Sequence, residues 1–188
     1  MKNLFALGVM ILVFLSCEKD NSTKVELSSD YFPLKVGNYW NFEHVGKYMV
    51  SETQMVNGVE YFKIATDYST TMLYRNHDNK IFTKESSLDN SEVMKFDLTA
   101  EVNDTWTYGD GNVTLVNRNA TVTIGEMQID SCLKFNFRNE NLIDYGYSIW
   151  LAPRIGLIQQ TCQECFGSSF VTMKLVKVNI NNQETEFK

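Results

Sequence analysis

The stretch KYMVSETQMVNGVEYFKIATDY, residues 47–68, predicts the fold class. Two runs typical of β-strands, KYMVSETQMV and VEYFKIATDY, flank the dipeptide Asn57-Gly58. Asn-Gly accommodates the positive φ angles that a two-residue hairpin turn requires, and it is the strongest local signal for a β-hairpin. We therefore expect two antiparallel strands joined by a tight turn at this point.

Similar turn signals recur along the chain and divide it into short runs. They lie at NHDN (76–79), LDNS (88–91), GDG (109–111), Gly125-Glu126, RNEN (138–141), Pro153-Arg154 and Phe166-Gly167. In LKFNFRN, the apolar residues Leu133, Phe135 and Phe137 share one face. In ATVTI, Val122 and Ile124 oppose two threonines. This period of two predicts strands that turn one face to a core and the other to water.

The fold expected from these runs is all-β. Between the turns there is room for about ten strands, and no segment has a convincing helical stripe. Successive hairpins give an antiparallel meander, and a twisted sheet of this size curls or closes. We expect a strongly curved sheet, a half-barrel or an up-and-down barrel, formed by residues 31–188 as a single β domain. SIWLA (148–152), apolar on both faces, would be an enclosed strand.

The first twenty residues differ from the rest of the chain. Lys2 precedes an apolar run from Leu4 to Leu15. As a helix this run would be about 18 Å long, which is short against a bilayer core of about 30 Å. It matches the hydrophobic region of a secretory signal peptide instead. Because Ser16 is the small residue that a signal peptidase requires, residues 1–16 are expected to be that signal peptide.

The segment FLSC (14–17) resembles the lipobox of bacterial lipoproteins. The resemblance implies that the thiol of Cys17 is acylated, for example with palmitate, and that Cys17 becomes the first residue after cleavage. Phe14 departs from the leucine that is usual at its position. Stable membrane attachment needs more than one acyl chain, and bacterial lipoproteins carry several. Residues 17–30 have no aromatic residue and no periodicity, so they are expected to be a flexible tether.

Charge limits what the exported chain can bind. Glu18 and Asp20 lie in a short acidic cluster, which resembles signals that route some lipoproteins to the outer membrane or cell surface, with the periplasmic face as the alternative. The chain has 17 basic and 23 acidic residues, and without residues 1–16 its net charge is about −7. This balance argues against nucleic-acid binding and against docking on anionic lipid by charge. The expected membrane contact is therefore the N-terminal lipid.

Four segments of the domain resemble a broad group of bacterial envelope lipoproteins of unknown function. They are YFPLKVGNYWNF (31–42), EVMKFDLTAEVNDTW (92–106), IGEMQIDSCLKFNF (124–137) and SIWLAPRIGLIQQ (148–160). The resemblance implies an all-β lipoprotein domain, and it carries over no catalytic residue. In the first segment, Gly37-Asn38 suits a turn. Trp40 and Phe42 share one face and would plug one end of the core.

Three cysteines remain besides Cys17, namely Cys132, Cys162 and Cys165. In an extended strand the last two would have their Cα atoms about 10 Å apart, whereas a disulfide needs less than about 7 Å. They are a candidate disulfide if CQEC (162–165) forms a β-turn. A bridge from Cys132 or free thiols are the alternatives. A redox CxxC usually begins a helix, and no helical pattern follows here.

The sequence predicts no catalytic residue, cofactor or metal site. It lacks the motifs HExxH, GxSxG, GxxxxGK[ST] and GxGxxG. Zinc would need paired ligands at suitable spacing, and the two histidines, His44 and His77, lie beside turns and are expected on the surface.

The leading hypothesis is a membrane-anchored, non-enzymatic envelope lipoprotein. Its concave face or loops would bind a small apolar ligand, a glycan or a protein partner. The alternative is a structural or accessory subunit of an outer-membrane or surface complex, which predicts an exposed apolar patch. A third hypothesis, a hydrolase of envelope polymers, requires convergent acids, or a nucleophile with a base, in one cleft.

Overall fold

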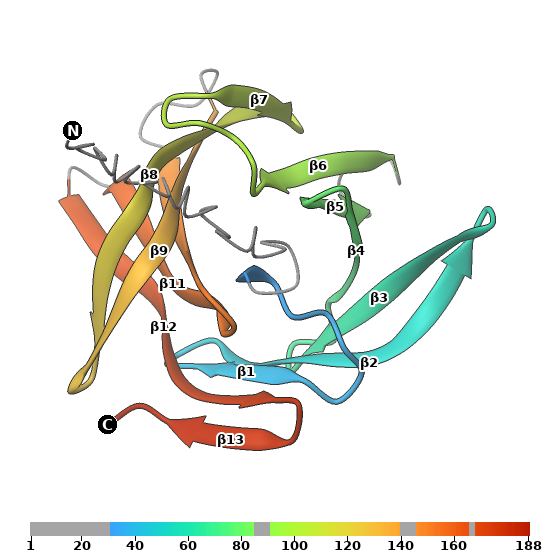
Figure 1. The fold of residues 1–188 in the computed structure, drawn as a ribbon, viewed down its shortest axis with the longest axis horizontal. Helices are drawn as coiled ribbons and strands as arrows, with labels where there is room; N and C mark the ends of the chain where they lie inside the picture. Colours follow the sequence, from blue (N-terminus) through green and yellow to red (C-terminus); the bar gives the residue numbers. More distant parts are fainter. Residues whose placement is uncertain (1–30, 85–90, 140–145, 166–167) are drawn as a thin grey trace, which may run out of the picture.

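The computed structural model describes residues 31–84, 91–139, 146–165 and 168–188, without the side chains of Glu164 and Cys165. These residues form 13 strands of one antiparallel sheet (Figure 1). The strands are β1 (Tyr39–Phe42), β2 (Gly46–Val56), β3 (Val59–Thr66), β4 (Thr71–His77), β5 (Lys80–Lys84), β6 (Glu92–Asp97), β7 (Thr105–Tyr108), β8 (Gly111–Ile124), β9 (Met127–Arg138), β10 (Gly146–Ala152), β11 (Gly156–Cys165), β12 (Ser168–Ile180) and β13 (Gln183–Glu186). No helix in the described ranges is long and apolar enough to cross a membrane.

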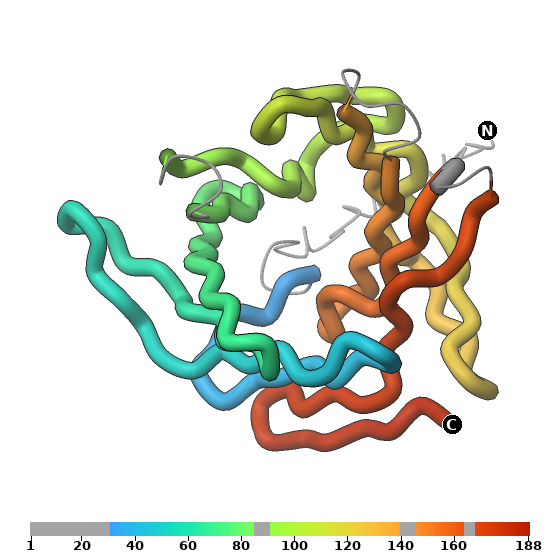
Figure 2. The backbone as a smooth tube through the Cα atoms, turned by 180° about the vertical axis from the view of Figure 1, so that it is seen from behind, coloured from blue at the N-terminus to red at the C-terminus, as the bar shows by residue number. Residues whose placement is uncertain are grey.

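The sheet closes almost completely on itself into a barrel (Figures 1 and 2). The strand order is β6-β5-β4-β3-β2-β1-β12-β11-β10-β9-β8-β7, and β13 pairs with β12 beside this path. Strands that follow each other in the chain are therefore neighbours, with β6 and β7 as the exception, and the distant strands β1 and β12 also pair. Among the described residues no strand pairing joins β6 to β7. An open seam separates these two end strands.

The all-β prediction and the antiparallel meander are confirmed, but the strands outnumber the expected ten or so. Three of them, β1, β7 and β13, have only 4 residues each, and so short a run shows no clear period of two. The predicted enclosed strand SIWLA (148–152) lies in β10. Within these five residues, only Trp150 is not fully buried.

Tight turns occur where Asn, Asp and Gly predict them. Asn57 (φ 51°) and Gly58 (φ 80°) join β2 to β3. Asp78 (φ 50°) and Asn79 (φ 61°) join β4 to β5. Positive φ at both central residues is the mark of a type I′ turn, whose twist matches that of the strands on either side. Local turn chemistry therefore fixes the register of these hairpins.

The predicted alternation places the core inside the barrel. Leu133, Phe135 and Phe137 of β9 are all buried, as are Val122 and Ile124 of β8. All five side chains belong to one continuous cluster of buried apolar residues. The interior of the barrel is therefore a hydrophobic core to which nearly every strand contributes.

Two of the segments that resemble envelope lipoproteins meet in space. The indole Nε1 of Trp40 donates a hydrogen bond to the carbonyl oxygen of Ile155, at 2.5 Å. Gly156 lies at φ +92°, and a Cβ atom there would be 3.1 Å from Pro33 and 3.2 Å from the ring of Trp40. The segment before β1 thus packs tightly on the β10–β11 turn, as the predicted core roles of Trp40 and Phe42 require, and both of these side chains are buried.

The end of the chain is fixed against the β8–β9 hairpin. The carbonyl oxygen of Lys188 accepts a hydrogen bond from the backbone N–H of Glu126 at 2.8 Å. Phe187 is buried in the core cluster, and its N–H donates to the carbonyl of Val176 at 2.9 Å. The last two residues therefore connect β12 to the tip of this hairpin.

Candidate functional site

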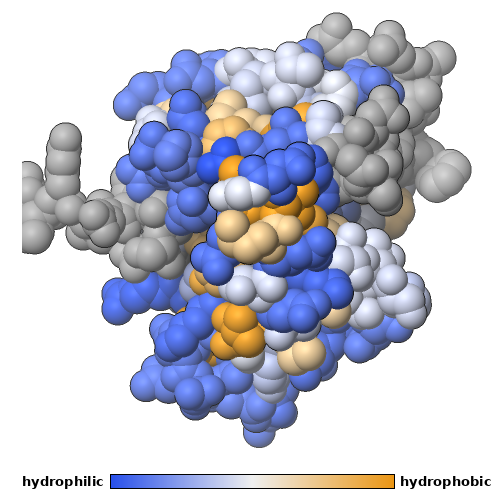
Figure 3. Space-filling model, turned by 90° about the vertical axis from the view of Figure 1, so that its right-hand side faces the viewer, coloured by the Kyte–Doolittle hydropathy of each residue, from blue (hydrophilic) through white to orange (hydrophobic). Residues whose placement is uncertain are grey.

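The candidate site is a cavity of about 110 Å³ inside the barrel. Its lining is mainly apolar, and six of the lining side chains are aromatic: Phe32, Trp40, Phe42, Tyr48, Tyr74 and Phe96. The outer surface differs, because the face drawn in Figure 3 is mostly hydrophilic with small apolar areas. A concave, apolar space with a few polar groups is the usual form of a small-molecule site.

Phe32 lies at the centre of the aromatic lining. Its ring centroid is 6.0 Å from that of Trp40, 5.4 Å from that of Tyr74 and 6.0 Å from that of Phe96. These distances are those of favourable aromatic pairs. The strand period brings Trp40, Tyr74 and Phe96 to the inside of the wall, whereas Phe32 comes from the segment before β1 (Figure 1). The chain thus begins its described course in the lumen.

Lys95 brings a positive charge to the cavity lining. Its Nζ donates to the hydroxyl of Tyr74 at 2.9 Å. The same Nζ lies 5.4 Å from the ring centroid of Tyr74 and 5.5 Å from that of Tyr108, which is within the range of cation–π attraction. Because Lys95 belongs to β6 and Tyr108 to β7, this side chain links the two strands across the open seam.

Two further polar side chains line the cavity, Gln160 of β11 and Tyr48 of β2. Gln160 pairs with Ile149 and Met173 across the sheet, and both of these neighbours are buried in the core. Gln160 therefore shares their inward face. Within the described part of the chain, neither the amide of Gln160 nor the hydroxyl of Tyr48 makes a hydrogen bond.

Burial also shows in the ionisation of Tyr48. Desolvation raises the pKa of this phenol, and the neighbouring Tyr74 raises it further, while the charge of Lys95 acts in the opposite direction. Tyr48 therefore stays neutral and keeps its proton over the whole physiological range. Its hydroxyl can donate a hydrogen bond or accept one.

A larger and more open groove of about 410 Å³ lies outside the barrel wall, beside Pro33, Arg154 and the β12–β13 hairpin. Arg154 is exposed at its edge. The groove is more open than the lumen, and polar residues such as Asn181, Gln183 and Thr185 line it, so it lacks the apolar enclosure that makes the lumen a site for a small molecule.

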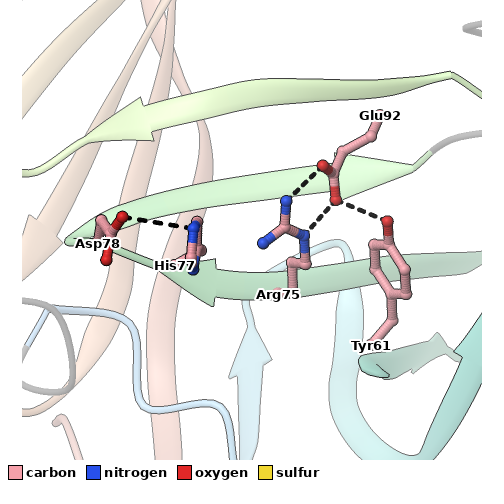
Figure 4. A network of polar contacts seen from close by, with 5 residues as sticks. All are labelled: Tyr61, Arg75, His77, Asp78 and Glu92. Atoms are coloured by element: carbon pink, nitrogen blue, oxygen red, sulfur yellow. Dashed lines mark hydrogen bonds and ion pairs between the residues drawn. The ribbon is translucent and has the colours of Figure 1, made fainter. Parts of the chain in front are cut away.

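A polar network ties strands together on the outer side of the wall (Figure 4). Arg75 of β4 binds the carboxylate of Glu92 of β6 through two nitrogens, and the Nη2–Oε2 distance is 2.6 Å. Tyr61 of β3 donates to the same carboxylate at 2.6 Å. The hydrogen bonds from Arg75 lower the pKa of Glu92, and this pairing raises the pKa of Arg75. A carboxylate neutralised in this way is a structural tie and a poor base.

The described residues bring no catalytic or metal-binding constellation together. No group of three or more His, Cys, Asp or Glu side chains among them is close enough to hold a metal ion. His44 and His77 are exposed beside turns, as predicted, with Glu43 and Asp78 as their acidic neighbours. Figure 4 includes the second of these pairs.

The cysteine pair of the candidate disulfide lies at the end of a strand. CQEC (162–165) does not form a turn: it is the last part of β11, with irregular pairing to β12 between Cys162 and Cys165. Cys132, the alternative partner, is a free and buried thiol, and burial raises its pKa to about 11. Since the side chain of Cys165 lies outside the described residues, the Cys162–Cys165 disulfide stays a prediction, as does lipidation of Cys17, which also lies outside them.

Sequence reasoning missed the polar residues of the cavity. Lys95 and Gln160 both lie in strands where polar residues are expected on the wet face. At Lys95 a bulge shifts the β5–β6 register between Ile81 and Phe82. Gln160 follows Gln159 in the sequence, and only the strand register distinguishes the inward glutamine from the outward one.

No protein-family model matches this chain, and no curated protein matches its sequence. One similar solved structure is of a protein from Bacteroides fragilis proposed to be exported, with a YmcC-like fold: the TM-score is 0.42 at 11% identity, over 84% of this chain and 99% of that one. Another is of a protein from Parabacteroides distasonis proposed to be a lipoprotein, with a TM-score of 0.42 at 11% identity, over 83% of this chain and 99% of that one. Likeness at this level carries no argument about the function of this chain.

Proposed function

We propose that this chain is a lipoprotein of the bacterial envelope, held by lipid on Cys17 at the outer membrane or cell surface, and that its barrel binds a small apolar ligand. The FLSC segment supports the anchor. The aromatic-lined cavity inside the barrel is the single observation that supports binding. None of the described residues that line it is an acid, a histidine, a cysteine or a serine, which favours binding over hydrolysis.

The size of the cavity limits the ligand. An apolar cavity of about 150 Å³ in a protein core stays dry and binds benzene. The lumen, at about 110 Å³, accommodates one small ring or the end of a larger apolar molecule. Transfer of apolar surface from water into such a space is favourable by roughly 25 cal/mol per Å².

Toluene is a suitable first probe of binding. A ligand that binds only the folded state stabilises it by about 2.7 kcal/mol at a concentration one hundred times its Kd. We expect toluene to raise the urea midpoint of residues 17–188. Met72→Phe, which fills the lumen, should abolish this effect, whereas Met55→Phe should keep it, because Met55 is exposed on the β2–β3 hairpin. If neither toluene nor benzene stabilises the wild-type protein, binding in the lumen is disproved.

The anchor is tested separately by mass spectrometry of the N-terminus. We expect the mature protein to begin at an acylated Cys17, and we expect globomycin to block its processing. Cys17→Ala should lack the lipid, and Cys132→Ala, which changes a buried thiol of the domain, should retain it. A wild-type N-terminus without lipid would contradict the proposed anchor.

A second candidate function, that of an accessory subunit in an envelope complex, is favoured by the β2–β3 hairpin. This hairpin projects from the barrel (Figure 1), and its exposed residues include Met55 and Val59. Exposed apolar side chains such as these are candidate contact points for another protein. If this function holds, Met55→Ser with Val59→Ser should lower the mass of the native complex extracted from membranes, and an unchanged mass would contradict it.

A further inference from the structure

The cavity contains hydrogen-bonding capacity that the chain does not use. Gln160 lies on the inward face between the buried Ile149 and Met173. Its amide offers two donors and an acceptor, and it binds no group among the described residues. The side chain of Gln160 is partly exposed, so its donors and its acceptor are available to a molecule that enters the cavity.

The side chains that line the cavity around this amide favour a ligand with an aromatic ring. Phe32, Trp40 and Phe96 present ring faces and edges to the cavity. Aromatic rings attract another ring in edge-to-face or offset geometry beyond the effect of buried area alone. Met72 and Met173 add polarizable thioethers to the lining, and sulfur contacts aromatic rings favourably. The volume admits one ring.

We propose that the lumen recognises a single aromatic ring that carries an oxygen hydrogen-bonding group, with Gln160 as the residue that selects the oxygen. The inference rests on the proposed function, and it adds the chemical class of the ligand. The amide oxygen of Gln160 accepts a hydrogen bond from the ligand's hydroxyl, or the amide NH₂ donates one to the ligand's oxygen. Tyr48, a neutral phenol in the same lining, is a second polar group within the cavity.

Phenol and toluene are matched probes, because they differ by a hydroxyl against a methyl group on the same ring. Their dissociation constants are measured by calorimetry for the wild-type domain, Gln160→Met and Gln159→Met. Methionine keeps the length of glutamine and removes its amide. Gln159 is the control, because it is the adjacent glutamine of β11 and does not line the cavity; its amide donates to Thr161 at 3.4 Å.

We expect the preference for phenol over toluene to fall about tenfold in Gln160→Met, the effect of one lost hydrogen bond, and to stay at the wild-type value in Gln159→Met. In the wild-type protein, phenol should also shift the side-chain amide resonances of Gln160 in a ¹H–¹⁵N spectrum further than toluene does, because both rings perturb nearby resonances but only phenol forms a hydrogen bond with the amide. This second measurement does not depend on the folding of a variant.

The outcomes separate the two proposals. If toluene and phenol bind but the ratio of their dissociation constants is the same in all three proteins and the Gln160 amide responds equally to both compounds, selection of oxygen is disproved and apolar binding stands. If neither compound binds the wild-type domain, the proposed function fails, and the inference about its ligand fails with it.

Discussion

Glu92 belongs to the edge strand β6, and its carboxylate is the point where three strands are joined. Arg75 and Tyr61 both donate to it, and the exposed fractions of the Arg75 and Glu92 side chains are only 20% and 25%. A half-buried pair of this kind is screened less by water than a surface ion pair. The stability of β6 should therefore depend on this one carboxylate.

Glu92→Gln is expected to lower the free energy of unfolding by about 1–2 kcal/mol at pH 7. The folded-state pKa of Glu92 is lowered, so its contribution is fully present above the reference value of 4.5 and is lost as pH falls through the folded-state value. The difference between wild type and variant should shrink below about pH 4. Urea titrations of both proteins at several pH values measure this difference in unfolding free energy.

The control for this substitution is Glu52→Gln. Glu52 pairs with Lys63 at 2.8 Å, but the pair is more exposed. We expect a cost of less than about 0.5 kcal/mol. Equal costs for the two variants would show that the network around Glu92 contributes no more than a surface pair.

Two glycines with the same backbone angle provide a second test. Gly156 and Gly37 both have φ +92°, but an added Cβ at Gly156 would lie 3.1 Å from Pro33, whereas at Gly37 it would meet no described atom within 4 Å. Gly37→Ala should cost about 1–2 kcal/mol for the left-handed conformation alone. Gly156→Ala should cost about 1–3 kcal/mol more, because it also overpacks the contact with Trp40.

Chemical denaturation of both alanine variants gives the comparison. Since the backbone strain is common to the two, the difference in unfolding free energy isolates the packing of the segment before β1 on the β10–β11 turn. Equal stabilities of the two variants would mean that the residues around Gly156 shift to accommodate the added methyl group at no cost.

Individual residues were predictable where one physical rule dominates. Trp40 and Phe42 were assigned to the core because large aromatic side chains are buried with their strand partners. Gln160 and Lys95 could not be assigned to the cavity, because whether a polar side chain faces inward depends on bulges and on pairing with distant strands. The aromatic residues of the candidate site were therefore predictable from the sequence, and its polar residues were not.

At the scale of elements, hairpins were predictable and long-range pairing was not. Asn57-Gly58 determines its own turn through local φ preferences. The pairing of β1 with β12 joins segments more than one hundred residues apart, for example Trp40 with Val178, and no local signal encodes it. Whether CQEC forms a turn is not predictable from its spacing, because CxxC is compatible with both a turn and the irregular end of a strand.

The end of the chain gives a prediction at this scale. Phe187 is 7% exposed and Phe170 of β12 is 47% exposed. Phe187→Ala should lower the unfolding free energy by about 3 kcal/mol and loosen the β8–β9 hairpin that Lys188 contacts. Phe170→Ala should cost less than about 1 kcal/mol. Thermal unfolding followed by near-ultraviolet circular dichroism distinguishes the two variants. Similar losses of stability in both would mean that the terminal segment is not held in the core.

At the scale of the whole molecule, the sequence predicted a curved sheet or barrel but not where it would remain open. Strand count and tight turns limit the topology to a meander that must curl. The position of the seam depends on whether β6 and β7 pair. These strands are joined by the segment 98–104, whose backbone hydrogen bonds form a turn and reach β8 and the β4–β5 turn. Tertiary contacts of this segment, and no local sequence signal, therefore keep β6 and β7 from pairing.

The seam predicts an uneven pattern of hydrogen exchange. Amides of β6 and β7 have a strand neighbour on one side only, and those of β9 and β10 on both. We expect faster exchange in the end strands. Lys95→Met removes the link to Tyr108 and should accelerate exchange in β6 and β7 further, whereas Lys134→Met, which removes only a cation–π contact with Trp150, should not. Uniform protection around the barrel would contradict an open seam.

The place where the chain begins its described course has a mechanical consequence. Tyr31 is buried and its hydroxyl donates to the carbonyl of Ser131 at 2.8 Å, and Phe32 stacks among the rings that surround the cavity. Tension applied to the polypeptide on the N-terminal side of Tyr31 is therefore borne first by the aromatic wall and not by an outer loop. A molecule bound against Phe32 would bear part of that load, so pulling on the N-terminal end should unfold the domain at a higher force when the cavity is occupied.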